Sequence, residues 1–229
     1  EVISTDNQIV NGKAGMKWGE FDVKAMVDGA KNDPSVIMWS LGNEIDEGVS
    51  GNTSHYLNLV DDLIKWVQEV DTTRPVTNGD NRKNTNPNAM LSQINQKIYE
   101  AGGVVGMNYA NGDQTIAMHN TYSDWPLYGS ETASAVHSRG VYNTTGKDDN
   151  TLQMSEYDND EAKVGWGHSA SDAWQFVIKN DFNAGTLQWT GMDYIGEPTP
   201  WNGTGAGSAS GQGAKPKSSY FGIVDTAGL

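Results

Sequence analysis

Apolar and polar positions along this chain follow two patterns, one typical of helices and the other of strands. Within residues 21–30 the apolar side chains recur at the spacing of one helix face, as Val23, Met26, Val27 and Ala30. The same rhythm predicts helices from Ser54 onward, around residues 91–98 and over residues 172–179. Short apolar runs predict five strands, at residues 36–44, 75–78, 104–109, 126–131 and 186–190, with a further strand-like piece at 220–224.

The order of these elements predicts the fold class. Strands that alternate with helices of this length pair in parallel through right-handed crossovers, so the chain is predicted to be α/β. A closed (β/α)8 TIM barrel needs eight such strands, and five are visible in the sequence. We therefore expect residues 1–229 to be one partial domain, the C-terminal portion of a TIM barrel from about strand 4 to strand 8. The missing remainder of the barrel is an expected partner, because open strand edges need cover.

Two glutamates close predicted strands and are the leading candidates for chemistry. Glu44 ends the run at residues 36–44, and Glu131 ends the run at residues 126–131. In a parallel α/β barrel the C-terminal ends of the strands carry the active site. An isolated glutamate is more often a solvated residue at the start of a loop, so the flanking sequence has to decide between the two interpretations.

Composition narrows the class of substrate. The formal net charge is −14 and the isoelectric point is near 4.5, so the clustered Lys and Arg that bind nucleic acid or an anionic membrane surface are lacking. The absence of cysteine excludes disulfides, a thiolate nucleophile and cysteine-type zinc sites. No apolar stretch approaches the roughly 20 residues of a membrane span. The four histidines show no metal-ligand spacing, and we assign no metal and no cofactor.

Three parts of the sequence resemble a known enzyme family. Residues 32–44 resemble the acid/base signature of family 2 glycoside hydrolases, and residues 128–131 resemble their nucleophile strand. The stretch at residues 189–201, followed by residues 218–225, is similar to the large surface β-galactosidases of Gram-positive bacteria. These motifs occur in the family's order, and the resemblance covers most of residues 16–229.

The resemblance implies a retaining mechanism that divides the work between Glu44 and Glu131. In such enzymes two carboxyl groups stand about 5 to 5.5 Å apart, one attacking the sugar and the other protonating the leaving oxygen. The resemblance makes Glu131 the nucleophile and Glu44 the acid/base, so the two are expected to converge. The implied activity is an exo-β-galactosidase that releases terminal β-linked galactose through a covalent galactosyl-glutamate. Transfer of the sugar to an acceptor, in place of water, would use the same intermediate.

Four further residues are candidates for binding the sugar. Asn43 could reach the sugar 2-hydroxyl, or it could bond its own backbone at the strand end. The resemblance implies that Tyr109 hydrogen-bonds and orients the nucleophile; the alternative is an ordinary core tyrosine. Trp189 could stack its indole on galactose or belong to the core. Trp201 follows two prolines that stiffen its loop, and it could form a wall for the sugar or simply pack.

Other functions stay open at this point. A related family 2 enzyme would act on a β-glucuronide or a β-mannoside, although the loop at residues 196–200 favours galactose. A non-catalytic sugar-binding or structural fragment is the other alternative. The expected partners are a β-galactoside oligosaccharide or glycan and, by resemblance, accessory β-sandwich domains. The resemblance alone implies an extracellular or cell-surface location.

Overall fold

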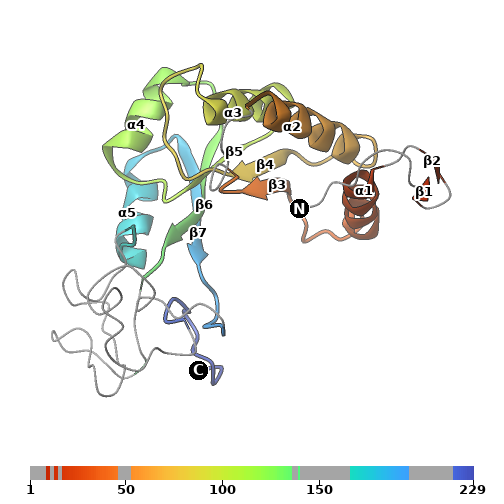
Figure 1. Ribbon diagram of the computed structural model, residues 1–229. Helices are drawn as coiled ribbons and strands as arrows, with labels where there is room; N and C mark the ends of the chain where they lie inside the picture. The colour runs from red at the N-terminus through yellow and green to blue at the C-terminus, as the bar shows by residue number, and fades with distance from the viewer. Residues whose placement is uncertain are drawn as a thin grey trace, which may run out of the picture. The chain divides into compact units, whose positions relative to one another are not determined.

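The computed structural model describes residues 9–10, 13–14, 17–45, 53–135, 139, 166–195 and 219–229. In these residues a short antiparallel hairpin is followed by helices and strands in alternation (Figure 1). The helices are α1 (Trp18–Ala30), α2 (Thr53–Gln68), α3 (Met90–Glu100), α4 (Gly112–Thr121) and α5 (Ala170–Lys179). The strands are β1 (Ile9–Val10), β2 (Lys13–Ala14), β3 (Trp39–Asn43), β4 (Val76–Gly79), β5 (Val105–Asn108), β6 (Leu127–Ala133) and β7 (Asn183–Trp189).

The chain divides into two compact units. Unit 1 comprises the described residues within Glu1–Met107 and Asp113–Tyr128, and unit 2 those within Asn108–Gly112 and Gly129–Leu229. Strands β1 to β4 and helices α1 to α3 belong to unit 1, together with nearly all of α4, whereas α5 and β7 belong to unit 2. Strands β5 and β6 each begin in unit 1 and end in unit 2. The last residues of these two strands are therefore part of unit 2.

The predicted alternation of helices and strands is confirmed, and three of its details are wrong. Strand β3 begins later than predicted, at Trp39, and is mostly not buried, because β4 is its only strand neighbour within the described residues. Glu131 lies inside β6 and not at its end, because β6 pairs with a strand on each side and continues to Ala133. Residues 220–224 form no strand and contribute an isolated parallel bridge to Met192.

The strands of unit 1 are held in a parallel register. Strand β3 pairs with β4, with Trp39 opposite Val76 and Asn43 opposite Gly79. Isolated parallel bridges connect β4 and the residue after it to the β5 region, at Thr77–Val104 and Asp80–Met107. Strands β4 and β5 are buried along their whole length, as is typical of parallel strands that are covered on both faces. In the three-stranded sheet the strand order is β5-β6-β7.

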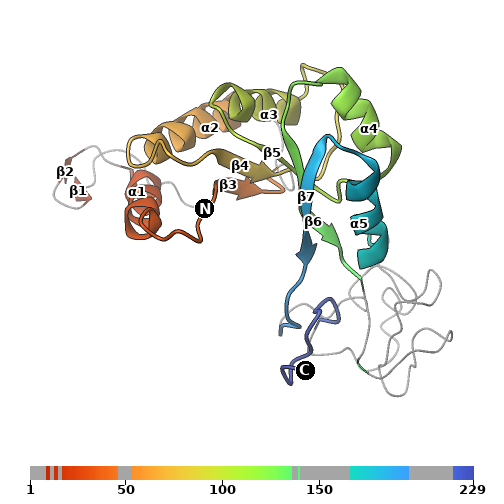
Figure 2. The ribbon, with the colours of Figure 1, turned by 180° about the vertical axis from the view of Figure 1, so that it is seen from behind.

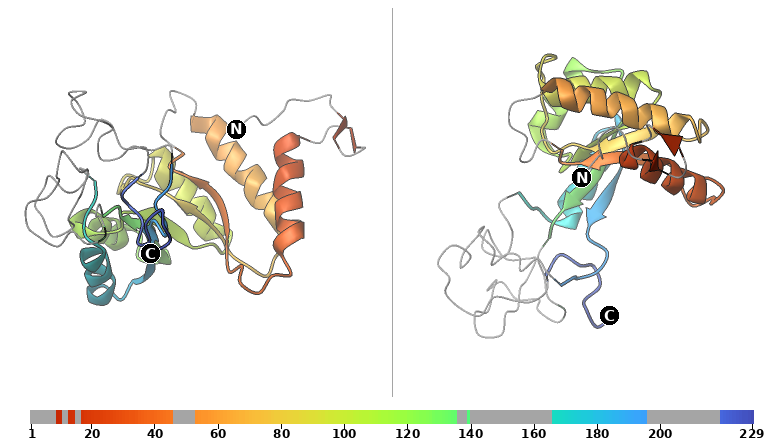
Figure 3. Two further views of the ribbon diagram at one scale, coloured as in Figure 1. Left: turned by 90° about the horizontal axis from the view of Figure 1, so that it is seen from below. Right: turned by 45° about the vertical axis from the view of Figure 1, so that its right-hand side comes forward.

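Amphipathic helices supply the core of unit 1. The residues that these helices bury lie at helical spacing and include Val60, Ile64 and Val67 on α2 and Leu91, Ile94 and Ile98 on α3. Helix α2 packs against α1, α3 and β3, and α3 packs against β4. Figure 1 shows α2 and α3 lying side by side, and Figure 3 shows α1 next to α2. The packing of these faces fixes the strands on which the candidate residues of unit 1 are placed.

In its described residues, unit 2 buries alanines and two aromatic residues, Phe176 and Phe221. Ala133, Ala135 and Ala173 form one buried apolar cluster. A Cβ atom on Gly129 would lie 2.8 Å from the Thr186 hydroxyl oxygen, so glycine allows β6 and β7 to approach closely. Helix α5 packs against β7 (Figure 2), and its first turn is capped by the Ser169 hydroxyl, which accepts from the Asp172 backbone N–H over 3.1 Å.

The end of the chain is tied to the residues that follow β7. The Asp193 carboxylate accepts a hydrogen bond from the Gly222 backbone N–H over 2.8 Å and from the Ser219 hydroxyl over 3.3 Å. A Cβ atom on Gly222 would collide with the Asp193 backbone nitrogen, so this contact requires glycine. These side-chain bonds explain why residues 220–224 follow an irregular path where a strand was predicted.

Candidate functional site

The carboxyl group of Glu131 receives a hydrogen bond from Tyr109, which directly follows β5. The Tyr109 hydroxyl donates to Oε1 of Glu131 over 2.7 Å, and the Tyr109 backbone N–H donates to the Glu131 carbonyl oxygen. The two residues, both in unit 2, are therefore joined through main chain and side chain. Hydrogen bonds to a carboxylate favour its ionised form, which is the form able to act as a nucleophile.

Tyr109 is held in place on several sides. Its backbone has a left-handed φ of 55°, which is uncommon for a residue other than glycine. Its hydroxyl lies 2.7 Å from the hydroxyl of buried Ser134. The ring of His168 meets the tyrosine ring edge to face, with centroids 6.3 Å apart and an interplanar angle of 76°. The Asn111 amide nitrogen in turn lies 3.2 Å from Nδ1 of His168. The phenol thus has a defined position next to Glu131.

A second polar contact lies one residue earlier on each strand. The Ser130 hydroxyl donates to Oδ1 of Asn108 over 2.7 Å, and Asn108 is fully buried. Ser130 precedes Glu131, and Asn108 precedes Tyr109. The pair therefore locks the relative register of the two strand ends from which the Glu131 and Tyr109 side chains project.

The other predicted acid, Glu44, directly follows β3 in unit 1. Its backbone has a left-handed φ of 47°, and its N–H donates to the Gly79 carbonyl over 2.8 Å. Asn43, the residue before it, is exposed. The Lys83 ammonium group interacts electrostatically with the carboxylates of Asp80 and Glu44. Burial lowers the pKa of Lys83 to about 8, against the opposing effect of these two carboxylates. Glu44 is therefore in the neighbourhood of a partly buried cation.

Buried amides organise the segment that leads to Lys83. The Asn78 side chain donates to Asn95 over 2.8 Å, and the Asn95 side chain donates to Oδ2 of Asp80 over 2.9 Å. The other oxygen of Asp80 accepts from the Arg82 backbone N–H over 2.9 Å. A buried polar group is costly when it lacks a partner. This series of hydrogen bonds therefore fixes the path of the residues that follow β4.

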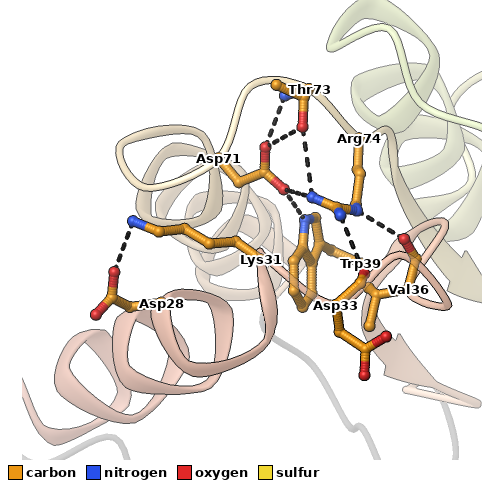
Figure 4. Close-up of polar contacts among 8 residues, drawn as sticks. All are labelled: Asp28, Lys31, Asp33, Val36, Trp39, Asp71, Thr73 and Arg74. Atoms are coloured by element: carbon orange, nitrogen blue, oxygen red, sulfur yellow. Dashed lines mark hydrogen bonds and ion pairs between the residues drawn. The ribbon is translucent and has the colours of Figure 1, made fainter.

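A separate polar cluster anchors the beginning of β3 (Figure 4). The Trp39 indole N–H donates to Oδ2 of Asp71 over 3.0 Å, and Arg74 Nη1 donates to the same oxygen over 2.8 Å. Arg74 also donates through Nε to the Val36 carbonyl over 2.6 Å. Hydrogen bonds from the hydroxyl and the backbone N–H of Thr73, followed by those from Arg74 and Trp39, hold the pKa of Asp71 well below its usual range. The strand that leads to Glu44 is thus fixed at its start.

The predicted aromatic residues are described only in part. Trp189 ends β7, is partly exposed, and donates through its indole N–H to the Tyr194 hydroxyl over 3.2 Å. The two rings meet edge to face with centroids 5.7 Å apart. Trp201 and the loop at residues 196–200 lie outside the described residues. Trp189 therefore has a partner that fixes the plane of its indole.

The structure brings together one pair of the predicted site residues, Tyr109 and Glu131. Glu44 and Asn43 lie in unit 1, whereas Trp189 lies in unit 2. The convergence of Glu44 with Glu131, and the roles assigned to all of these residues, stay predictions.

Three neighbours of the candidate acids were missed by sequence reasoning. Ser134 lies close behind Glu131 in sequence, and a search for hydroxyls near the nucleophile motif would have found it. His168 is one of the four histidines without metal-ligand spacing; it precedes α5 and packs on Tyr109. No sequence spacing connects Lys83 to Glu44, because their proximity arises from strand pairing.

Metal-binding clusters and membrane-spanning helices are both absent from the described ranges. No group of three or more His, Asp or Glu side chains there is arranged to hold a metal ion. No helix in those ranges combines the length and the apolar character that a bilayer crossing requires.

Comparisons with known proteins place this geometry in a family. The model of "Glycosyl hydrolases family 2, TIM barrel domain" matches residues 16–219. Beta-galactosidase BoGH2A of Bacteroides ovatus is 32% identical over 254 residues, which cover 93% of this chain and 27% of that protein.

Solved structures share the fold at lower identity. The β-galacturonidase of Eisenbergiella tayi bound to galacturonate matches with a TM-score of 0.55 and 16% identity, over 90% of this chain and 33% of that one. The β-glucuronidase of Bacteroides uniformis matches with a TM-score of 0.52 and 15% identity, over 92% of this chain and 24% of that one. The chain spans between 24% and 33% of the length of the three relatives named here. Because the family model covers most of its residues, the chain belongs to glycoside hydrolase family 2 and contains part of the family's TIM barrel domain.

Proposed function

We propose that the protein containing this chain is a retaining exo-β-galactosidase that releases terminal β-linked galactose from oligosaccharides or glycans. The proposal rests on family membership and on the similarity to a β-galactosidase of Bacteroides ovatus. The structural observation that carries it is the 2.7 Å hydrogen bond from Tyr109 to Glu131. A hydrogen bond from a neutral donor favours the ionised form of a carboxylate and orients it, as a nucleophile requires.

In the proposed first step Glu131 forms the covalent intermediate. One oxygen of its carboxylate attacks the anomeric carbon of galactose, and a new carbon–oxygen bond forms as the glycosidic bond breaks. The leaving oxygen takes a proton from Glu44, which acts as the general acid. The sugar is then an ester of Glu131, and Glu44 carries a negative charge.

In the proposed second step the same two residues act in reverse. Glu44 accepts a proton from water, and the water oxygen bonds to the anomeric carbon as the ester bond to Glu131 breaks. Glu44 regains its proton, Glu131 regains its charge, and galactose is released with its original anomeric configuration. A sugar hydroxyl in place of water gives transglycosylation by the same route.

Asn43 and Trp189 are proposed to bind the sugar, Asn43 at the 2-hydroxyl and Trp189 by stacking. Asn43 is exposed beside Glu44, so its amide is accessible. Trp189 has its indole N–H bonded to Tyr194, which leaves a ring face as the surface for the C–H groups of galactose. Trp201 keeps its predicted role as a further wall of the sugar site.

Covalent labelling tests the proposal directly. The whole protein is incubated with an activated 2-deoxy-2-fluoro-β-galactoside, digested, and analysed by peptide mass spectrometry. The expected result is one fluorogalactosyl group on Glu131, and no label on a Glu131→Gln variant. Labelling of another residue, or no labelling of an active protein, would contradict the assignment of the nucleophile.

The sugar specificity needs its own experiment, because family 2 structures with this fold include a β-glucuronidase and a β-galacturonidase. Rates are measured on a panel of aryl β-glycosides: galactoside, glucuronide, galacturonide and mannoside. The galactoside is expected to have the highest kcat/KM. A higher value for a uronide or the mannoside would keep the mechanism and replace the substrate.

A further inference from the structure

The hydroxyl of Ser134 lies within hydrogen-bond distance of the Tyr109 hydroxyl, the group that also donates to Glu131. Ser134 is 1% exposed, and its Oγ lies 2.7 Å from Oη of Tyr109, the same distance that separates Oη from the Glu131 carboxylate. We propose that Ser134 is a positioning residue that acts on Glu131 through Tyr109, forming a chain of hydrogen bonds that tunes the nucleophile. This inference rests on the proposed role of Glu131.

The number of hydrogens on each hydroxyl determines which group donates and which accepts in each hydrogen bond. A tyrosine hydroxyl has one hydrogen, and with Glu131 ionised this hydrogen is donated to Oε1. The contact between Tyr109 and Ser134 then requires Ser134 to donate to Oη. A phenol that accepts a hydrogen bond becomes a stronger donor, so the Ser134 hydroxyl strengthens the bond that stabilises the carboxylate.

The direction of the hydrogen bond between Tyr109 and Ser134 can also reverse without movement of heavy atoms. Once Glu131 is esterified it has lost its charge and is a poorer acceptor. Tyr109 can then donate to Ser134, because each hydroxyl is both a donor and an acceptor. The effect of Ser134 is therefore greatest in the free enzyme, where Glu131 is charged, and smaller in the covalent intermediate.

The backbone at Ser134 supports a role for its side chain. Ser134 has a φ of 48° and follows Ala133 with a φ of 72°, so two consecutive residues are left-handed. Glycine adopts this conformation without steric cost, whereas serine does so at a cost. The bond from the His168 backbone N–H to the Ala133 carbonyl, over 2.8 Å, holds this turn. A serine kept in a conformation that suits glycine indicates that its hydroxyl is needed.

Few titratable groups face this chain of hydroxyls. Glu131 on β6, Tyr109 after β5 and His168 before α5 are the titratable residues whose contacts with it are described. His168 meets the ring of Tyr109 edge to face, so it supports the orientation of the phenol. A change in the acidic limb of the activity profile is therefore assigned to Glu131.

Two substitutions separate the hydroxyl from the backbone. Ser134→Ala and Ser134→Gly both remove the hydroxyl, but glycine relieves the left-handed backbone and alanine does not. In the whole protein, the acidic limb of the kcat/KM profile is expected to move up by about 0.2 to 0.6 pH units in both variants, because the charge-assisted bond to Glu131 weakens. Equal shifts in two variants of different stability are the signature of a positioning role.

Ser169→Ala is the matched control, because it removes the exposed hydrogen bond that caps α5 and leaves the hydroxyls of Ser134 and Tyr109 in place. It is expected to lower stability and leave the acidic limb in place. The inference would be overturned if the acidic limb of the kcat/KM profile were unchanged in both Ser134 variants. It would also be overturned if Ser169→Ala shifted that limb equally.

Fluorogalactoside labelling of the parent protein distinguishes the two proposals. A parent that is active but unlabelled at Glu131 refutes the proposed nucleophile and, with it, this inference. If the parent is labelled at Glu131 and the acidic limb of the kcat/KM profile is unchanged in the Ser134 variants, only the role of Ser134 is refuted. If one variant fails to fold, the other decides, since the expected shift is the same in both.

Discussion

The two units of this chain fix their candidate acids by different means. The buried apolar residues of unit 1 are mostly large, and those with the least exposure include Val27, Val67, Val76, Ile94, Ile98, Met107 and Met118. In the described part of unit 2 the buried apolar residues are four alanines and two phenylalanines, one of which, Phe221, is 1% exposed. There the strand ends are joined by hydroxyl contacts, including those of Tyr109 with Glu131 and Ser130 with Asn108. The strand that leads to Glu44 is anchored by hydrogen bonds at its start, whereas the carboxyl group of Glu131 itself accepts a hydrogen bond from Tyr109.

This difference matters because the two proposed roles place different demands on geometry. A nucleophile has to keep one oxygen aligned with the anomeric carbon, and directional bonds provide that alignment. An acid/base has to take up and release a proton in turn, which is compatible with a backbone position fixed at a distance. Glu44 accordingly follows a strand that is anchored at its start by the Asp71 cluster.

The largest expected difference between the units is catalytic. Glu131→Gln should abolish turnover in the whole protein. Glu44→Ala should slow substrates with poor leaving groups by about 10²- to 10⁴-fold, while an activated aryl galactoside still forms the intermediate and azide speeds its breakdown. Steady-state rates and the burst of released phenol measure both effects.

Glu100→Gln controls for the loss of an exposed carboxylate at the end of α3 and should keep normal rates. Near-normal turnover of Glu131→Gln, or azide without effect on Glu44→Ala, would remove the respective assignment.

The next prediction compares the two cores. Ile98→Ala in unit 1 should destabilise the protein by about 2–5 kcal/mol, because it opens a cavity in a core of large side chains. Ala133→Gly in unit 2 should stay within about 1 kcal/mol of the parent, since the lost methyl group is offset by relief of its φ of 72°. Urea unfolding measures both, and a larger loss for Ala133→Gly would reverse the comparison.

Low pH should lower the stability of unit 1, because Asp71 becomes protonated. The pKa of Asp71 lies below its ordinary value of 3.8 because of the bonds from Thr73, Arg74 and Trp39. The stabilisation is therefore complete above this ordinary value and is lost as the pH falls toward the lowered pKa. Asp71→Asn should lower stability at pH 6 and flatten its decline in acid.

The control for this prediction is Asp28→Asn, which removes the exposed partner of Lys31 near the same cluster (Figure 4). Unfolding curves from pH 6 to pH 3 are compared for the two variants. A steeper decline for Asp71→Asn than for the parent would contradict the prediction.

The smallest expected effect concerns Lys83 and alkaline pH. Burial lowers its pKa from 10.5 to about 8, so the unfolded chain binds more protons than the folded protein between these values. This group therefore adds stability as the pH rises from about 8 to 10.5, on the order of 1 kcal/mol. Lys83→Met should lack that rise, whereas Lys65→Met, at an exposed position, should keep it. Equal pH dependence in the two variants would show that burial of Lys83 has no such effect.

The fold was largely predictable because each element has a strong local pattern. The apolar spacing on α2 and α3 marks the faces that these helices bury. Strands β4 and β5 are buried along their whole length although each contains polar residues, and their apolar residues were sufficient to predict them. The end of β6 was predicted wrongly, because pairing with strands on both sides carries Glu131 inside the strand.

The surroundings of the candidate acids were less predictable. Glu131 was identified from its motif, but the contacts of Ser134 and His168 depend on a turn of two left-handed residues. Local sequence favours such a turn when it contains glycine, and here it contains alanine and serine. Lys83 reaches Glu44 through pairing of β3 with β4, a contact that no residue spacing encodes.

Left-handed backbone at Glu44, Tyr109 and Ser134 limits which amino acids these positions can hold, whatever their chemistry. Valine, isoleucine and threonine fit such a conformation poorly, while glycine and asparagine fit it well. A saturation library at these sites would therefore pass through two filters, one for folding and one for catalysis. At Glu44, variants that keep the fold and lose the general acid should be richest in glycine and asparagine, and they offer slow forms suited to capturing bound sugar.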